Sequence, residues 1–170
     1  LAGAELIFSL VTADQAETVA KAAVPHLTRN AMFLDGNSCA PGTKRRSATA
    51  IEAAGARYVD VAIMSPIRPA LHKSPMLLSG PHAEAALDVM ERLDMNATIA
   101  EGEVGTASSI KMMRSVMIKG MEALVLECVL AARQAGVEDV VLESLEKTYP
   151  GFDWPARAAY MMERGTTHGL

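Results

Sequence analysis

The first hundred residues alternate short apolar runs with helical segments, and this alternation restricts the fold more than any other feature of the sequence. Runs with the length and composition of buried strands occupy residues 5–11, 31–35, 57–63, 75–80 and 98–100. Helical segments are predicted over residues 13–23, 43–54 and 82–93. Strands that alternate with helices are typical of a parallel sheet covered by helices, so we predict an α/β arrangement for this part of the chain.

The composition changes near Glu101, and only helices are predicted beyond it. The longest extends over Gly105–Ala135 without a proline, and two more follow over residues 137–149 and 154–163. Charged residues interrupt its most apolar part, 116–132, whereas a membrane-spanning helix needs about 20 residues with few or no charges. We therefore predict a buried helix of a soluble protein, and no membrane partner.

The composition argues against nucleic acid as a partner. Half of the 170 residues are hydrophobic, which is enough for a sizeable core, but only 4% are aromatic. The formal net charge is -4, and the one basic cluster, Lys44-Arg45-Arg46, is interpreted as a helix flank or an anion contact. The sequence thus has neither a broad basic surface nor an aromatic platform on which bases could stack.

The cysteines and histidines do not have the spacing of metal ligands. Cys39 and Cys128 lie far apart without a Cys-x-x-Cys motif, and the positions of His26, His72 and His82 follow no ligand pattern. We expect no metal, and we expect reduced thiols in a cytoplasmic protein.

Three of the predicted strands end in candidate binding residues. These are Val11 and Thr12 after the first strand, Asn37 and Ser38 after the second, and Ser65 after the third. Open α/β sheets bind ligands outside the carboxyl ends of their strands. The same polar residue types are also favoured in turns and helix caps, so a turn is the alternative interpretation of each cluster taken alone.

Lys111 lies early in the long predicted helix, after the small residues of Gly105–Ser109. Desolvation favours neutral lysine and lowers its pKa, which suits the side chain to proton transfer near neutral pH. The alternative is an exposed lysine on an amphipathic helix, because most lysines are solvated.

Three segments, in this order, resemble the β-hydroxyacid dehydrogenases, the family that includes 3-hydroxyisobutyrate and 6-phosphogluconate dehydrogenases. Residues 33–41 are similar to the family's substrate-binding segment. Residues 59–65 are similar to the strand that leads to its Ser-Gly-Gly substrate loop, and residues 105–111 to the glycine-containing motif that bears the catalytic lysine. The resemblance covers nearly the whole chain, as the latter part of such an enzyme.

Together with the element pattern, the resemblance implies the fold class α/β followed by all-α. We expect the C-terminal part of a Rossmann-like parallel sheet at residues 1–101, then a helical substrate and dimerisation domain at residues 102–170, built on the long helix and incomplete at its end. No Gly-x-Gly-x-x-Gly occurs in the sequence, and this turn normally holds the dinucleotide phosphates. We therefore expect a fragment that lacks the N-terminal dinucleotide-binding half.

The activity that the resemblance implies is oxidation of a small carboxylate-bearing hydroxyacid by hydride transfer to NAD or NADP. Lys111 would be the general acid and base of this reaction. The residues that would bind substrate are Asn37, Ser38, Ser65, Ser115 and His168. The residues that would lie against the nicotinamide end of the cofactor are Val11 and Thr12. A homodimer through the helical part is the expected assembly.

Several positions differ from the family pattern, among them Pro66 and Ile67, which replace the two glycines after Ser65, and two residues of the long helix. Ser115 stands where the family usually has an asparagine four residues after the lysine, and serine is shorter and makes fewer hydrogen bonds. Ile118 stands where the decarboxylating sugar-phosphate enzymes carry an acidic residue. This second difference argues against decarboxylation of 6-phosphogluconate.

Two other functions are compatible with the sequence. The first is a catalytically incompetent fragment, or a dimerisation or binding module of the same fold, with the Met-rich long helix as its interface. The second is a hydrolase that uses Ser38 or Ser65 as nucleophile, against which the lack of a placed histidine base counts.

Overall fold

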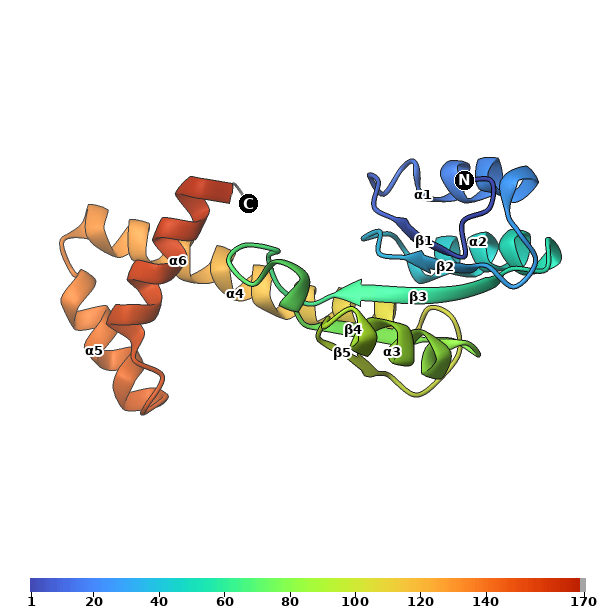
Figure 1. Ribbon diagram of the computed structural model, residues 1–170. Coiled ribbons are helices and arrows are strands. Elements are labelled where there is room, and N and C mark those ends of the chain that lie inside the picture. The colour runs from blue at the N-terminus through green and yellow to red at the C-terminus, as the bar shows by residue number, and fades with distance from the viewer. Residues whose placement is uncertain (169–170) are drawn as a thin grey trace. The chain divides into compact units, whose positions relative to one another are not determined.

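The computed structural model describes the backbone of residues 1–168 and the side chains of residues 1–165. The chain forms two compact units, Leu1–Met113 and Arg114–Leu170. The division falls within the long helix, after the change of composition at Glu101. Figure 1 shows the elements of both units.

The first unit alternates strands with helices, as the sequence predicts. Its strands are β1 (Leu6–Ser9), β2 (Met32–Asp35), β3 (Arg57–Ile63), β4 (Met76–Ser79) and β5 (Ala97–Ile99). Its helices are α1 (Ala16–Ala23), α2 (Pro41–Ala53) and α3 (Ala83–Arg92), with short 3₁₀ turns η1 (Val24–His26) and η2 (Leu71–Lys73).

The strands form one sheet in the order β1-β2-β3-β4-β5. β1, β2 and β3 are parallel, and β4 is parallel to β5, but β3 and β4 are antiparallel. The sequence analysis did not predict this antiparallel pair. Parallel neighbours need a crossover connection, usually a helix, whereas residues 64–75 between β3 and β4 contain only the turn η2. The carboxyl ends of β1, β2 and β3 consequently share one edge of the sheet.

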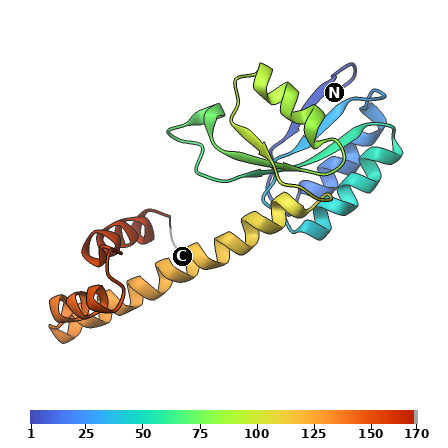
Figure 2. The ribbon, with the colours of Figure 1, turned by 90° about the horizontal axis from the view of Figure 1, so that it is seen from below.

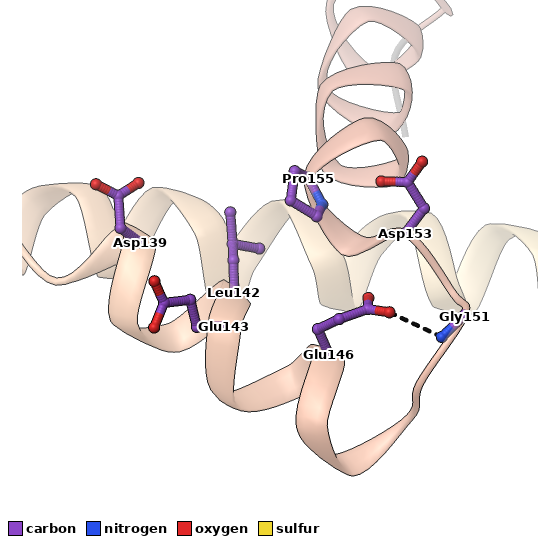
Figure 3. Close-up of a pocket in the computed structure, with 7 residues that line it drawn as sticks. All are labelled: Asp139, Leu142, Glu143, Glu146, Gly151, Asp153 and Pro155. Carbon is purple, nitrogen blue, oxygen red and sulfur yellow. Dashed lines mark hydrogen bonds between the residues drawn. The ribbon is translucent and has the colours of Figure 1, made fainter.

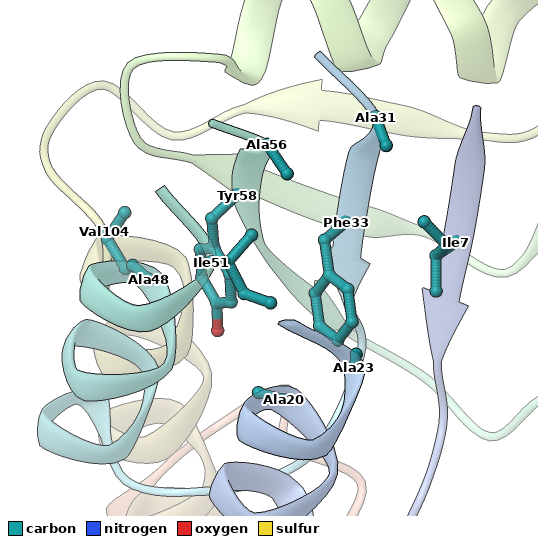
Figure 4. Packing of buried hydrophobic residues seen from close by; sticks show 10 residues of the cluster. All are labelled: Ile7, Ala20, Ala23, Ala31, Phe33, Ala48, Ile51, Ala56, Tyr58 and Val104. Atoms are coloured by element: carbon teal, nitrogen blue, oxygen red, sulfur yellow. The ribbon is translucent and has the colours of Figure 1, made fainter. Parts of the chain in front are cut away.

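Helices cover both faces of the sheet, with α1 and α2 on one face and α3 on the other (Figures 1 and 2). On the first face, every second strand residue packs against the two helices, as Ile7, Phe33 and Tyr58 do against Ala20 and Ile51 (Figure 4). The strand residues between them form a second cluster with α3, which includes Leu34, Val59, Ala86 and Met90. Full burial of one large apolar side chain contributes about 1.5–3 kcal/mol, so these two clusters stabilise the first unit.

The long helix α4 (Thr106–Ala135) begins in the first unit and continues into the second, where α5 (Glu138–Thr148) and α6 (Trp154–His168) follow. The core of the second unit includes Val125 and Val129 of α4 with Ala158 and Met161 of α6. The prediction of a buried helix over residues 116–132 is wrong for much of its length, since Val116 and Met117 are 67% and 64% exposed. The helix has apolar residues on several sides, and among the described side chains its partners in the second unit bury chiefly the side with Val125, Val129 and Ala132.

Two further features concern the hydropathy of the helices and the state of the cysteines. None of the helices within residues 1–168 combines the length and the hydropathy that a membrane crossing requires. Cys39 and Cys128 are both free thiols.

Candidate active site

A row of polar side chains crosses the sheet, with one residue from each of four neighbouring strands. The strand register pairs Ser9 with Asp35, Asp35 with Asp60, and Asp60 with Ser79. All four side chains are buried, and neither aspartate has any exposed surface. They lie on the face covered by α1 and α2, because Tyr58 of that face precedes Asp60 by two residues on the same strand. Two carboxylates directly opposite each other on adjacent strands repel, so the row needs a positive charge nearby.

Lys44, near the start of α2, supplies that charge. Its Nζ lies 2.9 Å from Asp35 Oδ1 and 3.4 Å from Asp60 Oδ1, and its side chain has no exposed surface. The same amine donates a hydrogen bond of 2.5 Å to the backbone oxygen of Asp35. Of the two interpretations of the basic cluster, Lys44 fits an anion contact, but its partners are buried carboxylates of the chain itself, which the sequence analysis did not predict.

Asp60 holds the beginning of α4. Its Oδ2 accepts hydrogen bonds from the backbone N–H groups of Gly105 (3.0 Å) and Ser108 (3.1 Å) and from Ser79 Oγ (3.1 Å). Its Oδ1 accepts a hydrogen bond of 2.6 Å from Ser108 Oγ, and Ser79 Oγ accepts one of 3.0 Å from the N–H of Ala107. The first N–H groups of a helix lack partners within the helix and carry partial positive charge, so a carboxylate at this position stabilises the helix.

Gly105 allows α4 to start close to α2. Its φ is +102°, and a Cβ at this position would lie 3.2 Å from Pro41 Cβ and 2.8 Å from Arg45 Nη1. Residues with a side chain rarely adopt a φ in this range. The glycine that opens the lysine segment is thus required by the backbone conformation and by the packing of the two helices.

Asp35 holds the loop that follows β2. Its Oδ1 accepts the N–H of Asn37 at 3.0 Å, and its Oδ2 accepts the Tyr58 hydroxyl at 2.6 Å. Burial, and then the charge of Asp35, raise the pKa of Tyr58, so the phenol remains a hydrogen-bond donor. Asn37 links the same loop to β1, because its Oδ1 accepts the N–H of Val11 at 2.5 Å and its Nδ2 donates to Ser9 Oγ at 2.9 Å. Most of the hydrogen-bonding capacity of Asn37 therefore serves the loop.

Lys111 contacts this loop from α4. Its Nζ donates a hydrogen bond of 2.9 Å to Ser38 Oγ. The lysine is half-buried, and burial, followed by the charge of Lys44, lowers its pKa. Burial likewise raises the pKa of the neighbouring Cys39 thiol. The structure thus brings together Lys111 and Ser38, with a lysine that is neutral to a larger extent at a given pH than an exposed one.

The two residues predicted to contact the cofactor follow β1. Val11 and Thr12 are both exposed, and Val11 is fixed by its hydrogen bond to Asn37. The connection from β1 to α1, residues 10–15, contains no glycine, so it cannot form the glycine-rich turn that holds a pyrophosphate. These residues therefore provide no glycine-rich cradle for the phosphates of a dinucleotide.

The remaining predicted residues are not brought to Lys111 by any side-chain contact that the structure describes. Ser65 is half-buried, and its hydroxyl donates to the backbone oxygen of Pro66 at 3.2 Å. Ser115 follows Lys111 by one turn of α4 and shares its helix face. The side chain of His168 lies outside the described residues.

The sequence analysis did not identify the buried charges that contact the end of β2 and the start of α4, chiefly Lys44 and Asp60. One signal was present, because Asp60 interrupts the apolar strand 57–63 and a charge buried in a strand needs a partner. The identity of that partner follows only from the register of β2 and β3 and from the position of α2.

An apolar cavity of about 220 Å³ lies beside the loop after β2. Its lining includes Phe8, Leu10, Gly36, Ile63, Leu71 and Met95. A Cβ on Gly36 would lie 2.7 Å from Leu10 Cδ2, so glycine keeps this space open. The cavity is located at the carboxyl ends of the parallel strands, the edge where open α/β sheets bind ligands.

A larger hollow of about 600 Å³ lies in the second unit, between α5 and α6 (Figure 3). The carboxylates of Asp139, Glu143, Glu146 and Asp153 line it. Glu146 already accepts the N–H of Gly151 at 2.7 Å and so holds the connection between the two helices. None of the predicted site residues with described side chains lines this hollow. Within the described residues, no group of three or more His, Cys, Asp or Glu side chains is arranged to hold a metal.

No protein-family model matches the sequence. An uncharacterized 28.5 kDa protein from the 7S RNA 5′ region of Methanothermus fervidus is 31% identical over 144 residues, which are 85% of this chain and 54% of that protein. The chain thus spans about half the length of the curated relative that it matches.

Solved structures resemble the chain over most of its length. A conserved hypothetical protein from Sinorhizobium meliloti 1021 is 39% identical with a TM-score of 0.87, and the match covers 99% of this chain and 56% of that one. The conserved protein MTH1747, of unknown function and structurally similar to 3-hydroxyacid dehydrogenases, is 32% identical with a TM-score of 0.83, covering 96% and 61% of the two chains.

More distant structures share the fold. A 3-hydroxyisobutyrate dehydrogenase from Mycobacterium tuberculosis, solved with L-serine, is 15% identical with a TM-score of 0.73 and covers 90% of this chain and 54% of its own. An imine reductase from Myxococcus stipitatus in complex with NAD+ is 17% identical with a TM-score of 0.69. The match covers 95% of this chain and 57% of that one. These matches confirm the predicted fold class, α/β followed by all-α.

Proposed function

The chain has the fold of the 3-hydroxyacid dehydrogenases, and from this premise we propose that it carries the proton-transfer site of an NAD(P)-dependent oxidoreductase that acts on a small hydroxyacid. The observation that supports the proposal most is the hydrogen bond between Lys111 Nζ and Ser38 Oγ, made by a half-buried lysine with a lowered pKa. A site at the carboxyl ends of the parallel strands is also where this kind of sheet binds its ligands.

Lys111 is assigned the role of general base in the direction of oxidation. Its neutral Nζ accepts the proton of the substrate hydroxyl and returns it in the direction of reduction. Half-burial increases the neutral fraction of the lysine near neutral pH, which suits it to this role. NAD or NADP, when bound, supplies the hydride acceptor for the carbon that bears the hydroxyl.

Ser38 is assigned to the substrate hydroxyl, because its Oγ already lies 2.9 Å from Lys111 Nζ and can donate to a third group. Asn37 retains one amide hydrogen for the substrate beyond its contacts to Val11 and Ser9. Ser65 is proposed to bind the substrate carboxylate. Roles for Ser115 and His168 in substrate binding stay predictions.

The proposed cofactor is NAD or NADP, on the strength of the fold and of a neighbour that holds NAD+. The nicotinamide end is assigned to Val11 and Thr12, which are exposed at the carboxyl end of β1. The apolar cavity lined by Leu10 opens on the same edge of the sheet and suits the apolar part of such a ligand.

Substitution Lys111→Ala tests the proposed function. We expect kcat for oxidation of small hydroxyacids to fall by about 10²- to 10⁴-fold, the usual contribution of a general acid or base, with an unchanged circular dichroism spectrum. The assay follows NAD(P)H absorbance in the protein as its gene encodes it.

Lys119→Ala is the matched control, because Lys119 is an exposed lysine about two turns further along α4. Its turnover is expected to equal that of the wild type. Wild-type turnover in Lys111→Ala would remove the assignment of the proton-transfer role.

A second candidate function, a dimerisation module of the same fold, is supported by the exposed apolar side chains of α4. Within the second unit, Val116, Met117, Leu124 and Leu130 are all more than half exposed. Contiguous apolar surface of this kind commonly marks a protein interface. A homodimer through this helix is therefore part of the proposal, and it is compatible with the enzymatic function.

A further inference from the structure

We propose that Lys44 is a positioning residue for the Lys111–Ser38 pair, joining the loop that carries Ser38 to the start of the helix that carries Lys111. The inference rests on the proposed function of Lys111. It goes further by assigning a role to a buried charge that the proton-transfer step does not itself use.

The need for Lys44 follows from the strand register. Asp35 and Asp60 are direct neighbours on β2 and β3, and neither carboxylate has exposed surface. Two buried carboxylates placed in this way repel each other, and the low dielectric of the interior strengthens the repulsion. Lys44 Nζ lies within 3.4 Å of an oxygen of each, so one ammonium group attracts both carboxylates and offsets part of their repulsion.

Each carboxylate holds one half of the candidate site. Asp35 accepts the backbone N–H of Asn37, the residue before Ser38, at 3.0 Å. Asp60 accepts the N–H of Ser108, one helical turn before Lys111, at 3.1 Å. Lys44 bridges the two carboxylates. A displacement of Lys44 Nζ is therefore transmitted to the Ser38 hydroxyl through Asp35 and to the Lys111 amine through Asp60.

Lys44 also acts on Lys111 through its charge. The charged and titratable groups on the elements around the start of α4 include Lys44, Arg45, Asp35, Asp60, Cys39 and Tyr58, with Glu101 and Glu103 just before the helix and Arg114 further along it. Among them, the positive charge of Lys44 lowers the pKa of Lys111, in addition to the larger effect of burial. Loss of the Lys44 charge consequently raises the pKa of Lys111 toward its ordinary value.

Stability alone does not account for a buried charge cluster at this place. Buried ion pairs can often be replaced by apolar side chains without loss of stability, because desolvation offsets much of their attraction. In this chain the cluster accepts hydrogen bonds from the two segments that carry Ser38 and Lys111, which must meet for the proposed chemistry. The geometry therefore points to a role for Lys44 in arranging them.

The test measures the titration of Lys111 in the 170-residue chain and needs no enzymatic activity. Lysines are labelled with a trace of acetic anhydride from about pH 6 to about pH 11, a range that brackets the ordinary lysine pKa, and labelling at Lys111 is quantified by peptide mass spectrometry. In Lys44→Met we expect labelling of Lys111 near neutral pH to fall by about three- to tenfold, since one unit of pKa changes the neutral fraction about tenfold.

If Lys44→Met does not fold, the titration of Lys111 is measured in a double variant. Asp35→Asn combined with Lys44→Met removes one carboxylate together with the ammonium, so the net charge of the cluster stays at one negative charge as in the wild type. A titration curve of Lys111 shifted to higher pH in this folded variant supports the proposal, and a wild-type curve overturns it. Lys21→Met, at an exposed lysine of α1, controls for the loss of any lysine.

The failure of this inference is distinguishable from failure of the proposed function. Wild-type titration of Lys111 in the double variant removes only the positioning role of Lys44. Retained turnover in Lys111→Ala removes the proton-transfer role and leaves the titration result unaffected.

Discussion

Lys111 and Lys44 are two lysines of the same unit in different environments. Lys111 is half-buried with a hydroxyl partner, whereas Lys44 is enclosed between two carboxylates. The first was a candidate from the sequence, because it follows a run of small residues in a segment that resembles a dehydrogenase motif. The second was not, since the neighbouring Arg45 and Arg46 suggest a solvated cluster and its partners lie on other elements. Candidate residues that belong to a local motif can therefore be selected from this sequence, whereas residues whose contacts depend on tertiary register cannot.

Gly105 gives a prediction at the scale of a single residue. Gly105→Ala places a Cβ 3.2 Å from Pro41 Cβ at a φ of +102°, so we expect the free energy of unfolding to fall by about 2–4 kcal/mol. Urea-induced unfolding measures this loss.

Gly136→Ala is the matched control, because its φ is also positive, at +70°, but a Cβ there meets no atom within 4 Å. It is expected to cost about 1 kcal/mol through backbone strain alone. Equal losses in the two variants would show that the contact between α4 and α2 is not crowded at Gly105.

At the scale of elements, hydrophobic periodicity predicted the strands and helices of the first unit nearly to their ends. β3, for example, occupies Arg57–Ile63 as predicted. The direction of β4 could not be predicted in the same way. Periodicity does not distinguish a crossover connection, which leads to a parallel strand, from a direct connection, which leads to an antiparallel one. Twelve residues separate β3 from β4, and their path is set by tertiary packing that no local pattern encodes.

Glu17 of α1 gives a prediction at this scale, because it pairs with Lys21 of the same helix and with Arg46 of α2. The Arg46 guanidinium, and then Lys21, lower the pKa of Glu17 from 4.5 to about 2. A carboxyl group with a lowered pKa in the folded state adds stability above its ordinary pKa, and this contribution disappears as the pH falls from about 4.5 toward about 2. We therefore expect Glu17→Gln to lower the Tm near pH 7 and to change it much less near pH 2.

A double-mutant cycle with Arg46→Gln isolates the contact between the two helices. The coupling between Glu17 and Arg46 is expected near neutral pH, to weaken in high salt because the pair is exposed, and to vanish at low pH. A coupling that is independent of pH would assign the effect to packing instead of charge.

At the scale of the whole molecule, α4 belongs to both compact units, and its apolar residues exceed what its partners cover. Leu124 and Met117 are 69% and 64% exposed, while Val125 and Val129 of the same helix are buried. Apolar composition alone predicted that the helix is buried, and it could not distinguish burial within the chain from burial against another chain.

The proposed homodimer gives a prediction at this scale. Leu124→Lys introduces a charge on the exposed apolar side of α4, so we expect it to raise the dissociation constant of the dimer about 30-fold or more, which corresponds to about 2 kcal/mol. Sedimentation equilibrium measures the change.

Gln134→Lys is the control, because it adds the same charge at an exposed polar position in the last turn of α4. It is expected to leave the dimer intact. A wild-type chain that sediments as a monomer at all concentrations would rule out the homodimer.

The charge balance between Asp35, Lys44 and Asp60 limits how this sequence can evolve. Loss of Lys44 alone leaves two buried carboxylates facing each other, and breaking a buried ion pair by removing one partner is strongly destabilising. Loss of the lysine together with one aspartate keeps the balance. A substitution at one of these three positions is therefore tolerated only together with a compensating substitution at another.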